Sequence, residues 1–170
     1  MSEPTQVTRP EAAVEEWLLT SAVAPRNARK SWDEGRTAAL RCGKAFTSVC
    51  IPARLVYAGA SSTDPGAVAD YLRGALCGGP VIVAGPNRCV HTLMPTAVAL
   101  WWSAPETTCA GRGTVLNVPR PDVDRHAGAR TYWAVPPDRP GALCSPVAVT
   151  QLVAYTRFVL VTAKADSHAR

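Results

Sequence analysis

The stretch GGPVIVAGPNRCVHTLMP, residues 78–95, places Cys89 and His91 two positions apart. In a β-strand, residues i and i+2 point to the same face, so these two side chains are expected to lie together. A thiolate and an imidazole can bind a soft metal or form an activated thiol nucleophile. A metal site needs three or four ligands, however, and no further ligand stands at a recognisable spacing. The sequence therefore predicts an ordinary β-hairpin, with no metal site and no catalytic pair.

A second group of reactive side chains lies in RPDVDRHAG, where Asp122, Asp124 and His126 alternate. Two carboxylates in a D-x-D spacing can share a Mg²⁺ ion, which prefers oxygen ligands. Three neighbouring arginines are able to neutralise these carboxylates: Arg120, Arg125 and Arg130. The favoured interpretation is a solvated loop with local ion pairs and no cofactor, and Mg²⁺-dependent phosphoryl chemistry is the alternative.

The net charge of +5 is unevenly distributed along the chain. Residues 1–25 carry a net charge of −3, whereas residues 26–44 carry +4. A compact basic segment attracts phosphate groups, although it can equally dock on an acidic neighbour such as the N-terminal segment. The candidate nucleic-acid-binding residues are Arg26, Arg29, Lys30, Arg36, Arg41 and Lys44.

Other common signatures are absent. The sequence contains no P-loop, no G-x-G-x-x-G and no G-x-S-x-G motif. Its six cysteines include no C-x-x-C pair, so we interpret most of them as small buried hydrophobic residues in a reducing compartment. Aromatic residues that could stack on bases, or else belong to the core, are Trp101, Trp102, Tyr132 and Trp133.

The N-terminus is acidic and lacks the basic start and apolar stretch of a signal peptide. No apolar run approaches the roughly 20 residues that a bilayer requires. The expected location is therefore the cytoplasm, without membrane association.

Periodicity and capping signals predict the elements that position these residues. Helices are expected over 8–25, opened by a capping box at Thr8–Glu11, and over 31–43, opened by a second box at Ser31–Glu34. The strongest helix pattern covers 63–79, a short helix begins at Thr96, and the last helix begins at Ser145-Pro146. Strands are expected over 46–51, 80–84, 89–94, 114–119 and 130–136, with a turn at 85–88.

This mixture predicts an α+β fold. We expect a small mixed or antiparallel sheet of about five short strands with a central hairpin, packed by four to five helices. The expected organisation is an N-terminal acidic helix over 1–25, a single α+β domain over 26–164, and a frayed tail over 165–170.

Five runs follow one another between about Trp32 and Leu152: SWDEGRTAALRCGKAFTSVCIPARLV, GGPVIVAGPNRCVHTLMP, TAVALWW, GTVLNVPRP and TYWAVPPDRPGALCSPVAV. In this order the chain resembles a family of small actinobacterial proteins. That family in turn looks like a shortened, degenerate form of the N-terminal domain of bifunctional DNA primase/polymerases.

The resemblance implies that catalysis has been lost. Active primase-polymerase domains present an acidic D-x-D pair, followed by a strand with a Ser-x-His motif. His91 matches that histidine, with Arg88 or Cys89 in place of the serine, but no D-x-D pair precedes it. Asp122 and Asp124 come after the histidine instead.

The predicted function is a non-catalytic binding or regulatory module, with nucleic acid as the first candidate partner. One alternative is a divergent metal-dependent nucleotidyl transferase that uses His91, Asp122 and Asp124 with Mg²⁺. Another is a protein–protein adaptor anchored by Trp17 or Trp32.

Overall fold

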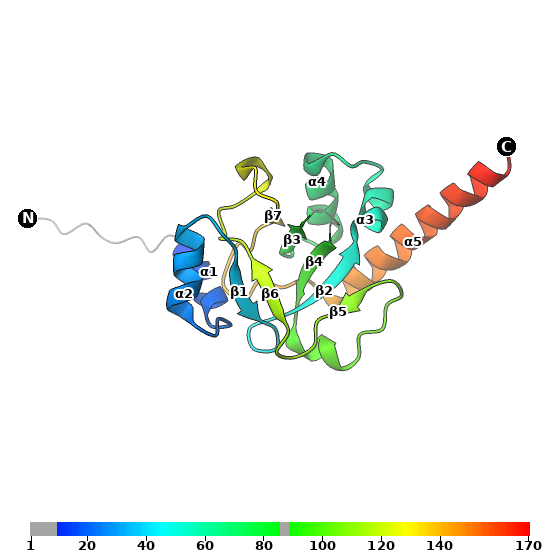
Figure 1. Cartoon of the computed structure of the whole chain (residues 1–170). Coiled ribbons are helices and arrows are strands. Elements are labelled where there is room, and N and C mark those ends of the chain that lie inside the picture. The colour runs from blue at the N-terminus through cyan, green and yellow to red at the C-terminus, as the bar shows by residue number, and fades with distance from the viewer. Residues whose placement is uncertain (1–9, 86–88) are drawn as a thin grey trace, which may run out of the picture.

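The computed structural model describes residues 10–85 and 89–170. Within these residues the chain forms five α-helices and two antiparallel sheets, so the predicted α+β fold is confirmed (Figure 1). The Thr8 capping box and most of the 85–88 turn, including Arg88, lie outside the described residues.

The larger sheet has the strand order β5-β2-β4-β3-β7, and every neighbouring pair is antiparallel. Its strands are β2 (Thr47–Pro52), β3 (Val81–Ala84), β4 (Cys89–Met94), β5 (Thr108–Cys109) and β7 (Tyr132–Val135). The β3–β4 hairpin lies at the centre of this sheet, as the sequence predicts. The smaller sheet pairs β1 (Ala38–Arg41) with β6 (Val115–Val118).

Three helices cover one face of the larger sheet: α3 (Ala53–Ala60), α4 (Pro65–Ala75) and the start of α5 (Pro146–His168) (Figure 1). Alternate β2 residues Val49 and Ile51 point into this layer, where they meet Leu72 of α4 and Leu152 of α5. Gly59 of α3 lies so close to α5 that an added Cβ would stand 2.6 Å from the Thr156 methyl carbon. A residue larger than glycine would therefore force the neighbouring Thr156 and Tyr71 side chains, or the helices that carry them, to shift.

The opposite face of the sheet is covered only in part. The β1–β6 ribbon, α1 (Pro10–Leu19) and α2 (Pro25–Asp33) pack on one end of it. Two buried tryptophans hold this second layer, because the Trp32 indole N–H donates to the Val118 carbonyl and the Trp133 indole N–H donates to the Pro119 carbonyl. The remaining part of this face is where Cys50, Cys89 and His91 lie.

The helix predicted over 63–79 is confirmed as α4, and local sequence signals explain where it begins and ends. The Asp64 side chain accepts a hydrogen bond from the Ala67 N–H at 2.9 Å, and Pro65 occupies the first turn. After the helix, Cys77 and Gly78 take positive φ angles of 52° and 79°, which turns the chain toward β3. The start and the end of α4 are therefore both determined within a few residues of the helix.

The prediction of a helix over 31–43 is wrong. The first helix ends at Leu19 rather than at Pro25, and Pro25 instead opens α2, which ends at Asp33. Gly35 then adopts a φ of 72°, and the chain continues as β1 in register with β6. The capping pattern at Ser31 therefore falls inside α2 and begins no helix. Residues 38–41 form a strand because they pair with β6, which is distant in the sequence.

Several elements differ from the expectation in length or were not expected. The α3 helix, β1 and β5 are additional elements, and the segment from Thr96 forms a 3₁₀-helix, η1 (Thr96–Leu100). A second 3₁₀-helix, η2 (Arg125–Ala127), lies in the loop before β7. The last helix continues to His168, so residues 165–168 are helical rather than frayed.

Helix α5 projects away from the rest of the domain (Figure 1). Its buried residues all lie in its first half: Val149, Leu152, Val153 and Thr156. By length and composition alone it is the one helix in the described ranges that could cross a membrane, with a mean hydropathy of 1.3 and 22% of that window buried. This criterion is weak for a single helix, because core helices of other folds also meet it.

Candidate functional site

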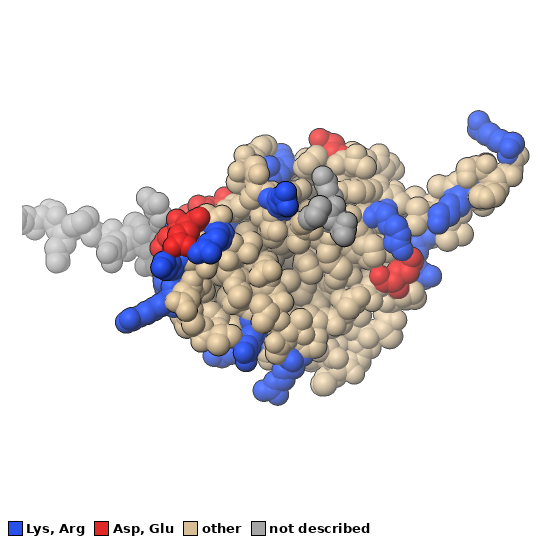
Figure 2. All heavy atoms as spheres, in the orientation of Figure 1, with Lys and Arg blue, Asp and Glu red and all other residues tan. Residues whose placement is uncertain are grey.

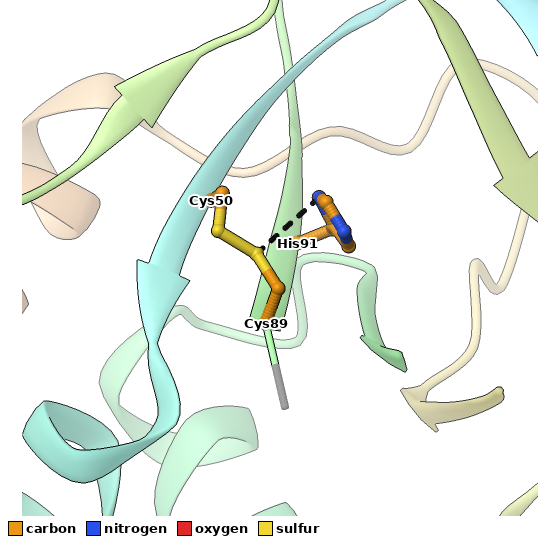
Figure 3. Close-up of side chains that lie close together, drawn as sticks. All are labelled: Cys50, Cys89 and His91. Carbon is orange, nitrogen blue, oxygen red and sulfur yellow. Dashed lines mark hydrogen bonds between the residues drawn. A yellow bond between two sulfur atoms is a disulfide. The ribbon is translucent and has the colours of Figure 1, made fainter. Parts of the chain in front are cut away.

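Three reactive side chains meet on the partly covered face of the larger sheet (Figure 3). Cys50 of β2 is the direct cross-strand partner of His91 of β4, and Cys89 stands two residues before His91 on the same face. Cys50 and Cys89 form a disulfide with a Cα–Cα distance of 5.8 Å, a usual separation for such a bond. The Cys89 sulfur lies 3.9 Å from His91 Nδ1.

Ser48 completes this cluster from β2. Its Oγ lies 3.1 Å from His91 Nδ1, and the Ser48 side chain is buried. This contact orients the ring so that Nδ1 faces both the hydroxyl and the sulfurs. Burial lowers the pKa of His91 below its ordinary value, so the neutral imidazole is favoured in the folded protein.

Sequence reasoning found Cys89 and His91 and their shared face, but it missed Cys50 and Ser48. The 46–51 strand was predicted, and Ser48 and Cys50 stand two positions apart on it, so that their side chains share one face. What the sequence alone lacked was the β2–β4 register, which sets Cys50 opposite His91. The cysteine interpretation also changes, because Cys50 and Cys89 are half-buried disulfide partners rather than free hydrophobic residues.

The remaining cysteines are free thiols. Cys42 and Cys144 are buried, as expected of small hydrophobic residues, and burial raises the pKa of Cys144 to about 12. Cys109 is half-buried and Cys77 is exposed. Among the described residues, only Cys50, Cys89 and His91 form a group of three ligand atoms within 4.8 Å of one another.

The acidic loop residues have local roles. Asp124 caps η2 by accepting the His126 N–H at 2.9 Å, and Asp122 lies 3.7 Å from the Arg120 guanidinium. Arg120 also donates to Glu15 of α1 at 2.9 Å. The ligand atoms of His91, Asp122 and Asp124 do not come together within 4.8 Å. Of the three arginines expected to neutralise this loop, Arg120 forms the ion pair with Asp122, and the three residues of the metal-dependent alternative do not form one cluster.

The predicted basic residues divide into two groups. On and just after α2, Arg29 pairs with Glu16, Arg36 pairs with Glu34, and Lys30 lies 3.9 Å from Glu34. The first helix thus neutralises Arg29 through Glu16, whereas the partner of Lys30 and Arg36, Glu34, belongs to the basic segment itself. Arg26 is exposed, with no ion pair to another described residue.

The second group, Arg41 and Lys44, lies at a groove of about 400 Å³ where the turn after β1 meets the turn before β6, together with Arg112, which was not among the predicted basic residues. Arg41, Lys44 and Arg112 line it, and none of the three forms an ion pair with a described residue. Gly43, with a φ of 111°, brings the two turns together, since its absent Cβ would lie 2.7 Å from Arg112 Cγ. Figure 2 shows Lys and Arg side chains without acidic neighbours along the lower edge of the molecule.

The aromatic residues do not form a single platform. Trp133 is buried and Tyr132 is half-buried, whereas Trp101 is 57% exposed. Trp32 is buried, and Trp17 packs edge-on against Phe46 with ring centroids 6.3 Å apart. Trp32 thus belongs to the core, whereas Trp17 is half-buried and keeps part of its ring exposed.

Comparison of the chain with protein-family models, with curated proteins and with solved structures finds no match.

Proposed function

We propose that this chain is a non-catalytic nucleic-acid-binding module whose phosphate contacts come from the groove lined by Arg41, Lys44 and Arg112. The observation that supports it is the contrast between these three cations and those of α2. The groove cations are exposed and without described ion-pair partners, whereas Arg29, Lys30 and Arg36 already have carboxylate neighbours.

Unpaired cations are the better phosphate ligands. A cation that already contacts a carboxylate must give up that attraction before it binds phosphate, whereas an unpaired one gives up only water and counterions. The rim of the groove also has a defined shape, because hydrogen bonds connect the two turns: the Cys42 N–H donates to Thr114 O, and the Gly113 N–H donates to Cys42 O, both at 2.8 Å. Contacts of this kind give affinity without sequence specificity.

The test is a fluorescence-anisotropy titration with labelled single-stranded DNA, double-stranded DNA and RNA at several salt concentrations. The groove variant is Arg41→Ala/Lys44→Ala/Arg112→Ala. The matched control, Arg29→Ala/Lys30→Ala/Arg36→Ala, removes the same charge from the paired group.

We expect the groove variant to lose most of the affinity and the control to lose much less. The slope of log K against log salt should become shallower by roughly 2–3 in the groove variant, at about 0.7–0.9 per phosphate contact. Equal losses in the two variants would indicate attraction by net charge alone. Absence of binding by the wild type at low salt would overturn the proposal.

A further inference from the structure

The Cys50–Cys89–His91 cluster has the composition of a site for a thiophilic metal. Zinc binds cysteine sulfur at about 2.3 Å and histidine nitrogen at about 2.0–2.1 Å, usually in a tetrahedron. In that geometry two ligand atoms of one ion stand roughly 3.4–3.8 Å apart. The Cys89 sulfur and His91 Nδ1 are 3.9 Å apart, close to this separation without any movement of the backbone.

The fold also satisfies the other requirements of such a site. The three ligands come from β2 and β4, which are held in register over six residue pairs from Thr47↔Met94 to Pro52↔Cys89. All three side chains are partly exposed, so an ion can reach them from solvent. Ser48, through its contact with Nδ1, holds the ring with this nitrogen turned toward the sulfurs.

We propose that, once the Cys50–Cys89 disulfide is reduced, Cys50 Sγ, Cys89 Sγ and His91 Nδ1 bind one Zn²⁺ ion, with the fourth position open to water. Two equivalents of a monothiol such as glutathione supply the two electrons and two protons of the reduction. The protein S–S bond breaks to give two thiols, and the reductant's sulfurs join in a new disulfide. Zinc then replaces the two thiol protons, which pass to solvent.

The disulfide and the bound metal therefore exclude each other at the Cys50–Cys89–His91 site. In the oxidised state the two sulfurs are bonded to each other and cannot act as thiolate ligands. In the reduced state the metal occupies both thiolates and protects them from oxidation. The Ser48 hydroxyl contacts Nδ1 only in the metal-free protein, because it must leave this nitrogen when the metal binds.

The first experiment titrates Co²⁺, a spectroscopic substitute for zinc, into protein reduced with a phosphine, and then displaces it with Zn²⁺. We expect one equivalent to bind with a thiolate-to-cobalt charge-transfer band. No such band should appear in protein whose disulfide is intact. Cys50→Ser, Cys89→Ser and His91→Ala should each weaken binding by at least about tenfold, since even outer-shell partners of a metal cost about 10–100-fold.

The matched control is Cys77→Ser, which removes an exposed thiol elsewhere and should bind cobalt like the wild type. A reduced wild type that binds no metal, or site variants that bind as tightly as the wild type, would overturn the proposal.

A second measurement needs no variant and so does not depend on variant folding. Reduced wild type is alkylated with and without Zn²⁺, and each cysteine is quantified by mass spectrometry. Zinc should protect Cys50 and Cys89 but not Cys77. Equal alkylation of Cys50 and Cys89 in both samples would contradict the metal site.

Discussion

The two faces of the larger sheet are made by the same strands but have different surroundings. On β2, Val49 and Ile51 point into the apolar layer under α3, α4 and α5, whereas Ser48 and Cys50 point to the opposite face. The β1–β6 ribbon and the first two helices cover only part of that opposite face. The alternation of a strand thus lets one segment contribute both to the core and to a reactive, half-exposed cluster. The first face is expected to stabilise the fold through apolar burial alone, whereas the second also carries the reactive side chains.

The largest expected loss of stability comes from a substitution in the helix-covered face. Leu72 of α4 is fully buried, so Leu72→Ala should lower the free energy of unfolding by about 2–5 kcal/mol through lost burial and a residual cavity. Urea denaturation measures it, with Leu100→Ala as the control because Leu100 is 89% exposed. Similar losses in both variants would contradict the assignment of Leu72 to the core.

The next effect concerns the half-exposed cluster. The Cys50–Cys89 disulfide closes a loop with a sequence separation of 39, so breaking it should cost roughly 2–4 kcal/mol by freeing the unfolded chain. Cys50→Ser in oxidising buffer should match the wild type in reducing buffer without metal. Cys77→Ser should keep the wild-type response to reductant. A wild-type unfolding free energy that does not depend on reductant would contradict this expectation.

The smallest effect is a pH dependence from His91. Burial holds its folded pKa below the unfolded value of about 6.5, so the unfolded chain takes up a proton more readily. The contribution of His91 to stability is therefore complete above about pH 6.5 and decreases as the pH falls through the folded pKa. Urea midpoints between pH 8 and pH 5, measured at about half-unit steps in reducing, metal-free buffer, should show a decline that His91→Gln weakens.

The exposed His126 offers the control for this measurement. His126→Gln should keep the wild-type decline, whereas equal weakening in both variants would show that His91 is not its source.

The sequence predicts well those elements whose signals are local. The α4 helix carries its own cap at Asp64 and its proline at Pro65, and the β3–β4 hairpin combines two apolar strands around a turn sequence. The prediction fails at 31–43, where a good capping pattern coincides with a segment that pairs with β6. Ala38 is the cross-strand partner of Val118, a contact that no local pattern can indicate.

The candidate site follows the same rule. Cys89 and His91 are neighbours on one strand, so their shared face is readable from spacing alone. Cys50 enters the cluster only through the β2–β4 register, and a one-residue slip in that register would turn Cys50 away from His91. The groove cations Arg41, at the end of β1, and Arg112, in the turn before β6, are likewise brought together only by the β1–β6 pairing.

The projecting helix α5 has a mechanical consequence. Its close crossing with α3 lies at Gly59 and Thr156, and the residues from 157 to 168 extend about 18 Å beyond that point. Exposed apolar side chains, Phe158 and Val161, lie on this outer half. A tilt of about 10° at the crossing would move the far end by about 3 Å for that helix length. A force applied to the outer half of α5 would therefore act on the packed contact between α3 and α5, which belongs to the core.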